Sequence, residues 1–117
     1  MEKEWIEKHI SEMVQDICKL SEIPSVSAET GNPDMPFGKA CLDVLHAALD
    51  LGRSMGFEAF NHENYCGTLL WKGESDTEIG FFGHADVVPA GNGWTCCEPF
   101  KPVVKDGNSY WKRRQRQ

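Results

Sequence analysis

A histidine and an aspartate two positions apart are the side chains best able to do chemistry in this sequence. His84 and Asp86 follow the apolar run 78–83 and precede a loop rich in proline and glycine. Side chains two apart on an extended chain point the same way, so the Asp86 carboxylate can orient the His84 imidazole while the imidazole binds a metal ion. One histidine cannot hold zinc, which takes three or four protein ligands. Taken alone, the pair therefore fits a hydrogen-bonded structural role as well as a metal site.

The other histidines and the cysteines indicate no second site. His9 and His46 fall in predicted helices and His62 in a polar turn, where surface or packing roles are expected. The five cysteines form no C-x-x-C pair and lack zinc-finger spacing; they stand at positions 18, 41, 66, 96 and 97. This pattern excludes a disulfide scaffold, while the adjacent cysteines at 96–97 leave a redox role open.

Two helices are expected to precede the pair. Apolar residues recur every three or four positions from Ile6 to Leu20, which predicts an amphipathic helix of about five turns that ends before Pro24. A long loop rich in proline, glycine and serine is predicted over 21–37. The helical spacing returns over 38–55, so a second helix is predicted there.

Three short β-type runs follow the helices, over 57–60, 67–71 and 78–83. The last run is apolar on both faces, which predicts a central strand. His84 and Asp86 would then lie at its carboxyl end, the edge where α/β sheets bind ligands. The predicted fold class is α/β, with two helices packed on a mixed β-sheet.

Length and composition predict one soluble folded domain. The chain has 117 residues, of which 40% are hydrophobic and 26% charged, so collagen-like and disordered classes are excluded. No run approaches the ~20 apolar residues that span a bilayer. The charged start of the sequence also lacks the pattern of a secretory signal, so a cytoplasmic location without a membrane partner is expected.

The last seven residues differ in charge from the rest of the chain. Residues 1–110 hold all 18 acidic residues and eight of the 12 basic ones, a net charge of −10, whereas 111–117 carry +4. A basic tail can bind nucleic acid or an anionic membrane. Because this tail is short and lacks interleaved aromatic residues, we expect solvated residues and no nucleic-acid partner.

Several motifs in order resemble one enzyme family. Gly83-His84-Ala85-Asp86-Val87-Val88-Pro89, followed by Gly93-Trp94, Pro99-Phe100 and Asp106-Gly107, is similar to the opening of the catalytic domain of the aminoacylase, succinyl-diaminopimelate desuccinylase and carboxypeptidase G family of co-catalytic zinc metallopeptidases, metallopeptidase family 20. Four earlier segments resemble the PepV-like, Sapep-type dipeptidase branch: Ile23-Pro24-Ser25-Val26-Ser27, Pro36-Phe37-Gly38-Lys39, the run 51–57 and Asn64-Tyr65. The resemblance covers nearly all of residues 1–110.

The resemblance implies roles for two residues. His84 would be the first ligand of one of two zinc ions, with manganese as an alternative metal, and Asp86 would be the active-site carboxylate that positions its imidazole. In the family, two bridged metals polarise the scissile carbonyl and supply the nucleophile, while a glutamate acts as general base.

The resemblance ends after Tyr110. The family's bridging aspartate, its general-base glutamate and its distal histidine have no counterparts here, because no carboxylate follows Asp106. Residues 1–110 are therefore expected to be a partial catalytic domain and 111–117 a tail foreign to the family. A reading-frame break or a truncation is the hypothesis for this change, beside a naturally short paralogue.

The predicted function is that of a fragment of a dinuclear-metal dipeptidase, a hydrolase inactive as this isolated chain. Its substrate would be a dipeptide in the full-length enzyme. The alternative is a small non-enzymatic interaction module or pseudoenzyme derived from the family. A fragment would also leave apolar side chains uncovered, among them Phe81 or Phe82, Leu69 or Leu70, and Trp71.

Overall fold

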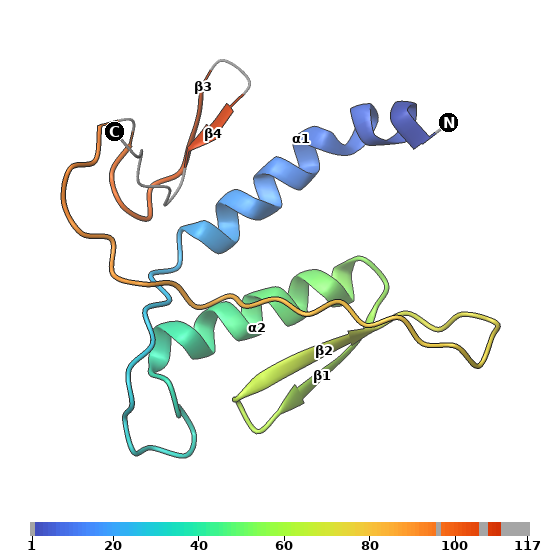
Figure 1. Cartoon of the computed structure of the whole chain (residues 1–117), viewed down its shortest axis with the longest axis horizontal. Helices are drawn as coiled ribbons and strands as arrows, with labels where there is room; N and C mark the ends of the chain where they lie inside the picture. The colour runs from blue at the N-terminus through green and yellow to red at the C-terminus, as the bar shows by residue number, and fades with distance from the viewer. Residues whose placement is uncertain (1, 96, 106–107, 111–117) are drawn as a thin grey trace. The chain divides into compact units, whose positions relative to one another are not determined.

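The computed structural model describes residues 2–95, 97–105 and 108–110. It divides the chain into two compact units. One unit is the continuous segment Ser25–Val88, and the other combines the residues before Ser25 with those after Val88. The described residues form two helices and four short strands (Figure 1). The predicted α/β class is therefore confirmed, with small antiparallel sheets beside the helices.

Helix α1 spans Glu2–Ser21, as its apolar spacing predicts. Acidic side chains lie in its first turn and Lys19 in its last, which suits the helix dipole at both ends. The Ser21 hydroxyl donates to the Ile17 carbonyl oxygen at 2.7 Å, and Pro24 follows soon after. No residue of α1 is buried, and its apolar stripe, Ile6, Ile10, Met13 and Ile17, is exposed.

The same unit also contains a short two-stranded sheet that was not predicted from the sequence. Strand β3, Val103–Lys105, pairs antiparallel with β4, Asn108–Tyr110. Val103 lies opposite Tyr110 and Lys105 opposite Asn108.

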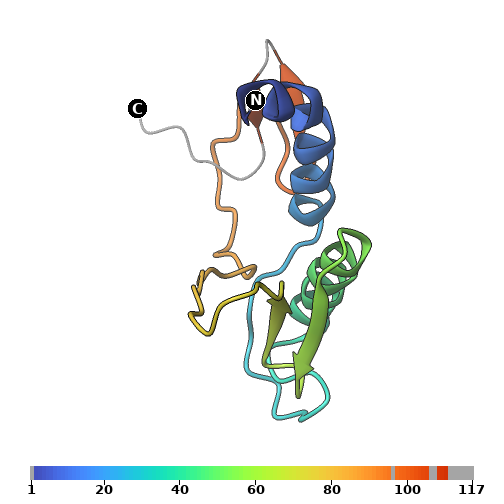
Figure 2. The same cartoon turned by 90° about the vertical axis from the view of Figure 1, so that its right-hand side faces the viewer.

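Helix α2, Lys39–Ser54, is the centre of the other unit. It begins after Gly38, which has a φ of 95°, and Gly56, with a φ of 94°, follows its carboxyl end. Strand β1, Glu58–His62, pairs antiparallel with β2, Cys66–Leu70, so that Glu58 lies opposite Leu70. Helix α2 packs along this hairpin, which both views show (Figures 1 and 2).

The core of this unit lies between α2 and the hairpin. Val44 and Leu49 are the buried hydrophobic residues of the described chain, each 3% exposed. The backbones approach closely because glycines face the contact: a Cβ added to Gly67 would lie 2.7 Å from Leu49 Cδ2. A Cβ on Gly52 would lie 2.3 Å from Leu69 Cδ2. Glycine on either side therefore sets how near helix and hairpin come.

The predicted central strand over 78–83 is wrong. Among the described residues, no main-chain hydrogen bond joins this run to a neighbouring segment. It belongs to the trace without strand pairing that follows β2 (Figure 1). A strand exists only where a second backbone takes up its hydrogen bonds, and apolar content alone cannot supply that partner.

The expected exposure of apolar side chains is confirmed. Phe81 is 95% exposed and Phe82 100%, while Leu69 and Trp71 are also exposed. Ile79 adds a further exposed side chain beside the phenylalanines. We call Ile79, Phe81 and Phe82 the apolar strip.

Candidate functional site

His84 and Asp86 lie against each other within the unit Ser25–Val88. The His84 Nδ1 atom is 2.9 Å from the main-chain oxygen of Asp86 and 3.3 Å from its Oδ1. A carbonyl oxygen and a carboxylate oxygen only accept hydrogen bonds, so Nδ1 must be the donor. The neutral imidazole therefore carries its proton on Nδ1 and a free electron pair on Nε2. This tautomer is the one that lets Nε2 bind a metal ion.

The imidazole is open to solvent. The His84 side chain is 81% exposed and that of Asp86 53%. Nε2 has no hydrogen-bond partner among the residues that the structure describes. The ring can thus be reached by an ion from outside without any other side chain moving.

The segment 84–87 is not placed by a strand end, contrary to the prediction. Instead, Val26 and Val87 form an isolated parallel bridge. The Val87 amide donates to the Ser25 carbonyl oxygen at 2.9 Å, and the Ser25 hydroxyl donates to the Ala85 carbonyl oxygen at 2.8 Å. The loop after α1, rather than a sheet edge, therefore positions the pair.

Ser25 is a site residue that sequence reasoning missed. Its side chain is 1% exposed, and it is the most deeply buried side chain of the described residues. A buried hydroxyl requires a hydrogen-bond partner, which Ala85 supplies. The available signal was a small polar residue directly after Pro24, in a loop whose motif resembled the dipeptidases.

Cys41 connects this loop to α2. Its Sγ donates to the Ser25 carbonyl oxygen at 3.4 Å. Burial raises the pKa of the Cys41 thiol, and the negative charge of Asp86 raises that pKa further. Both causes disfavour the thiolate, so Cys41 is a packing residue rather than a reactive nucleophile.

The charge of Asp86 can be tested through Cys41. We expect Asp86→Asn to lower the pKa of the Cys41 thiol, because one of the two causes of its elevation disappears. Alkylation of Cys41 by iodoacetamide, followed by mass spectrometry between pH 7 and 10, should then become fast at a lower pH than in the unchanged chain. The exposed Cys66 is the internal control and should keep its rate. An unchanged Cys41 profile would show that Asp86 does not act on this thiol.

The remaining histidines with recorded contacts have local partners. His9 stacks on Trp5, with ring centroids 4.2 Å apart, and its Nδ1 lies 2.8 Å from the Trp5 carbonyl oxygen. His62 Nε2 lies 2.8 Å from Thr68 Oγ1 across the hairpin. In residues 2–95, 97–105 and 108–110, no three histidine, cysteine or acidic side chains gather closely enough to hold a metal ion. The tail 111–117 and Cys96 lie outside the described residues.

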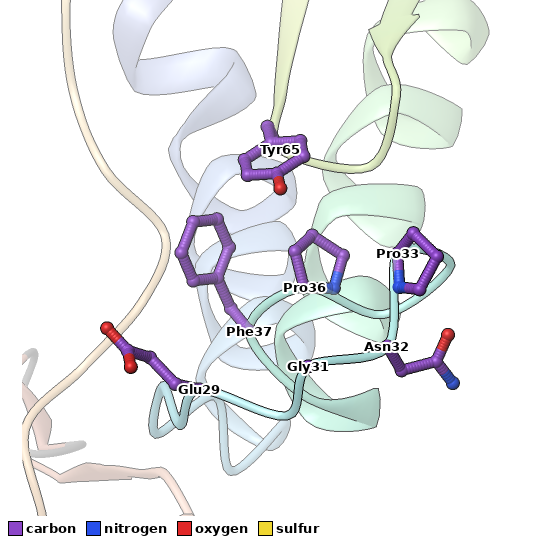
Figure 3. Close-up of a pocket in the computed structure, with 7 residues that line it drawn as sticks. All are labelled: Glu29, Gly31, Asn32, Pro33, Pro36, Phe37 and Tyr65. Carbon is purple, nitrogen blue, oxygen red and sulfur yellow. The ribbon is translucent and has the colours of Figure 1, made fainter.

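A pocket of about 410 Å³ lies elsewhere in the same unit (Figure 3). The Tyr65 ring covers it from the hairpin turn and meets Phe37 edge to face, with centroids 5.4 Å apart. The Asn64 side-chain amide donates to the Asp34 carbonyl oxygen at 2.8 Å, which ties the hairpin turn to the loop beneath. The lining contains no histidine or cysteine; it consists of Glu29, Gly31, Asn32, Pro33, Pro36, Phe37 and Tyr65. This pocket is therefore separate in composition from the His84–Asp86 pair.

Comparison with known proteins shows similarity to dipeptidases. The chain is 37% identical over 100 residues to "Putative dipeptidase YtjP" of Bacillus subtilis (strain 168), a match that covers 85% of this chain and 21% of that protein. It is 34% identical over 110 residues to the Beta-Ala-Xaa dipeptidase of Lactobacillus delbrueckii subsp. lactis, with 92% of this chain and 23% of that protein covered.

These similarities support a relationship to a dipeptidase family. The chain spans about a fifth of the length of these curated relatives. No protein-family model matches it. Neither helix of the described residues has the length and apolar content that crossing a bilayer requires.

Proposed function

We propose that this chain is part of a metal-dependent dipeptidase, in which His84 is a metal ligand and Asp86 orients its imidazole. The observation that carries the proposal is the contact of His84 Nδ1 with the main-chain oxygen and with Oδ1 of Asp86. That contact selects the tautomer whose Nε2 can bind a cation, in a chain similar to dipeptidases over most of its length.

The described residues fit part of a zinc site, namely one histidine ligand and the carboxylate beside it. His84 offers an exposed imidazole nitrogen, and Asp86 acts behind it as the carboxylate partner that metal-bound histidines commonly have. The further ligands that zinc needs are proposed to come from the part of such an enzyme that this chain does not include. When bound, two zinc ions, or manganese, would act as Lewis acids toward a peptide carbonyl and activate water.

The roles of the two residues are distinct. His84 Nε2 holds the cation, while the Asp86 oxygens keep the ring proton on Nδ1 and limit rotation of the ring. The Asp86 carboxylate, with Oδ1 3.3 Å from Nδ1, would also strengthen the ring as a donor to the metal, because an acceptor on the other ring nitrogen raises imidazole basicity. Neither residue is proposed as the general base.

The proposal is tested by metal titration of the chain labelled with ¹⁵N at its histidines. With one ligand the isolated chain should bind zinc only weakly, so zinc is added in large excess. The His84 Nε2 resonance should move before those of the other histidines, and Nδ1 should move little. His84→Ala should abolish this change, and His62→Ala should leave it intact because His62 has a separate partner in Thr68. Equal shifts at all histidines, or a first shift at another ring, would contradict the proposal.

Hydrolysis is expected to be nearly absent in the chain by itself. One histidine ligand cannot fix two metal ions, so turnover of dipeptides with added zinc or manganese should stay at the level of the metal alone. The rate of dipeptide cleavage for the chain and for His84→Ala measures this. Turnover that the substitution abolishes would refute the expected inactivity.

The similarity to dipeptidases does not favour a non-enzymatic interaction module. The metal identity, the domain boundary at residue 110 and the cytoplasmic location stay predictions.

A further inference from the structure

We infer that Ser25 is the positioning residue of the His84–Asp86 pair: it fixes both peptide planes that flank Asp86 and thereby selects the imidazole tautomer. The importance of this role for catalysis rests on the proposed function, whereas the geometry does not depend on it. Nothing in the motif around His84 points to this residue, which lies 60 positions away from Ala85.

Ser25 holds the peptide plane on each side of Asp86. Its hydroxyl donates to the carbonyl oxygen of Ala85, which belongs to the plane before Asp86. Its carbonyl oxygen accepts from the Val87 amide, which belongs to the plane after Asp86. Because peptide units are planar, these two planes determine φ and ψ of Asp86 and hence the direction of its Cα–Cβ bond.

The second plane also presents an acceptor to the imidazole. In a trans peptide, the Val87 N–H and the Asp86 C=O point in opposite directions. With the N–H bound to Ser25 on one side, the oxygen emerges on the other, where His84 Nδ1 lies at 2.9 Å. A rotated plane would remove this acceptor and weaken the preference for a proton on Nδ1.

Ser25 is itself held firmly. Its side chain is 1% exposed, and its carbonyl oxygen also accepts from Cys41 Sγ at 3.4 Å. Since Cys41 belongs to α2, the contact connects the site segment to the helix that forms the core. One buried serine thus orders an exposed segment, in which the side chains of Asp86 and His84 are 53% and 81% exposed.

The test compares Ser25→Ala with Ser27→Ala in the whole chain. Ser27 is an exposed neighbour for which the structure records no hydrogen bond, so it is the matched control. The readout is the ratio of the two His84 tautomers from imidazole ¹⁵N chemical shifts, assigned with His84→Gln. Ser25→Ala removes the hydroxyl bond to Ala85 and leaves the main-chain bond to Val87, so Asp86 is then held on one side only. We expect the tautomer ratio to shift toward Nε2–H by up to about fivefold, the effect of losing one ordinary hydrogen bond. Ser27→Ala should not change it.

Two further measurements test the inference if Ser25→Ala does not fold. Ser25→Cys keeps a side chain of similar shape with a weaker donor, so a shift in the same direction but smaller is expected. In the unchanged chain, hydrogen exchange at the Val87 amide should be slowed, because that amide is bound to Ser25. Unchanged tautomers in folded Ser25→Ala, an equal effect of Ser27→Ala, or unprotected Val87 would overturn the inference.

This test needs neither metal nor substrate. Failure of the zinc titration would therefore remove the proposed function and leave the tautomer result standing. A His84 tautomer ratio that does not change in Ser25→Ala would remove the positioning role and leave the assignment of His84 as a metal ligand intact.

Discussion

Replacing Leu49 with alanine should remove a large part of the stability of the unit Ser25–Val88. Leu49 is 3% exposed and lies where α2 meets Gly67 of the hairpin. Truncation of a buried leucine costs ~2–5 kcal/mol, the sum of lost apolar transfer and the cavity left behind. Small domains have a total free energy of unfolding of only about 5–15 kcal/mol, so the loss should be decisive.

Urea unfolding followed by circular dichroism measures this loss. Leu51→Ala, on the same helix at a half-buried position, is the matched control and should reduce the free energy of unfolding less. Equal losses from the two substitutions would contradict the placement of the core between α2 and the hairpin.

Charging the apolar strip should strongly reduce self-association. Phe81 and Phe82 are almost completely exposed, and water contact with a phenylalanine side chain costs ~2 kcal/mol relative to burial. The double substitution Phe81→Asp and Phe82→Asp removes this driving force and adds charge. Binding of the dye ANS and light scattering at rising protein concentration should both fall severalfold.

Val104→Asp is the control for the added charge. Val104 is an exposed apolar residue outside the strip, so its substitution should change ANS binding little. If Val104→Asp reduces scattering as much as the double substitution, general charge and not the strip controls association. Thermal unfolding should change little in either variant, since neither position is buried.

The helices were predictable because their signal is local. Apolar residues at three- and four-residue spacing report one face of a helix, and α1 and α2 lie within a few residues of the predicted ranges. The runs that form β1 and β2 were predicted nearly as well, although their antiparallel pairing as a hairpin was not predicted. Strands β3 and β4 were missed although Asp106-Gly107, a typical hairpin dipeptide, stands between them in the sequence.

The failures concern partners distant in sequence. The run 78–83 has strand-like composition, but composition does not state which backbone will pair with it. For the same reason, the pairing of His84 with Asp86 could be predicted from a two-residue spacing, whereas the contact of Ser25 with Ala85 could not.

The isolated bridge between Val26 and Val87 has a consequence for the order of folding. Helix α2 and the β1–β2 hairpin consist of contacts between near neighbours, which close quickly. The Ser25 contact closes a loop of 60 residues, whose entropy loss must come before any gain. On the ribosome, Val87 also emerges after α2 and the hairpin, so the histidine-bearing segment should acquire its order after both of them.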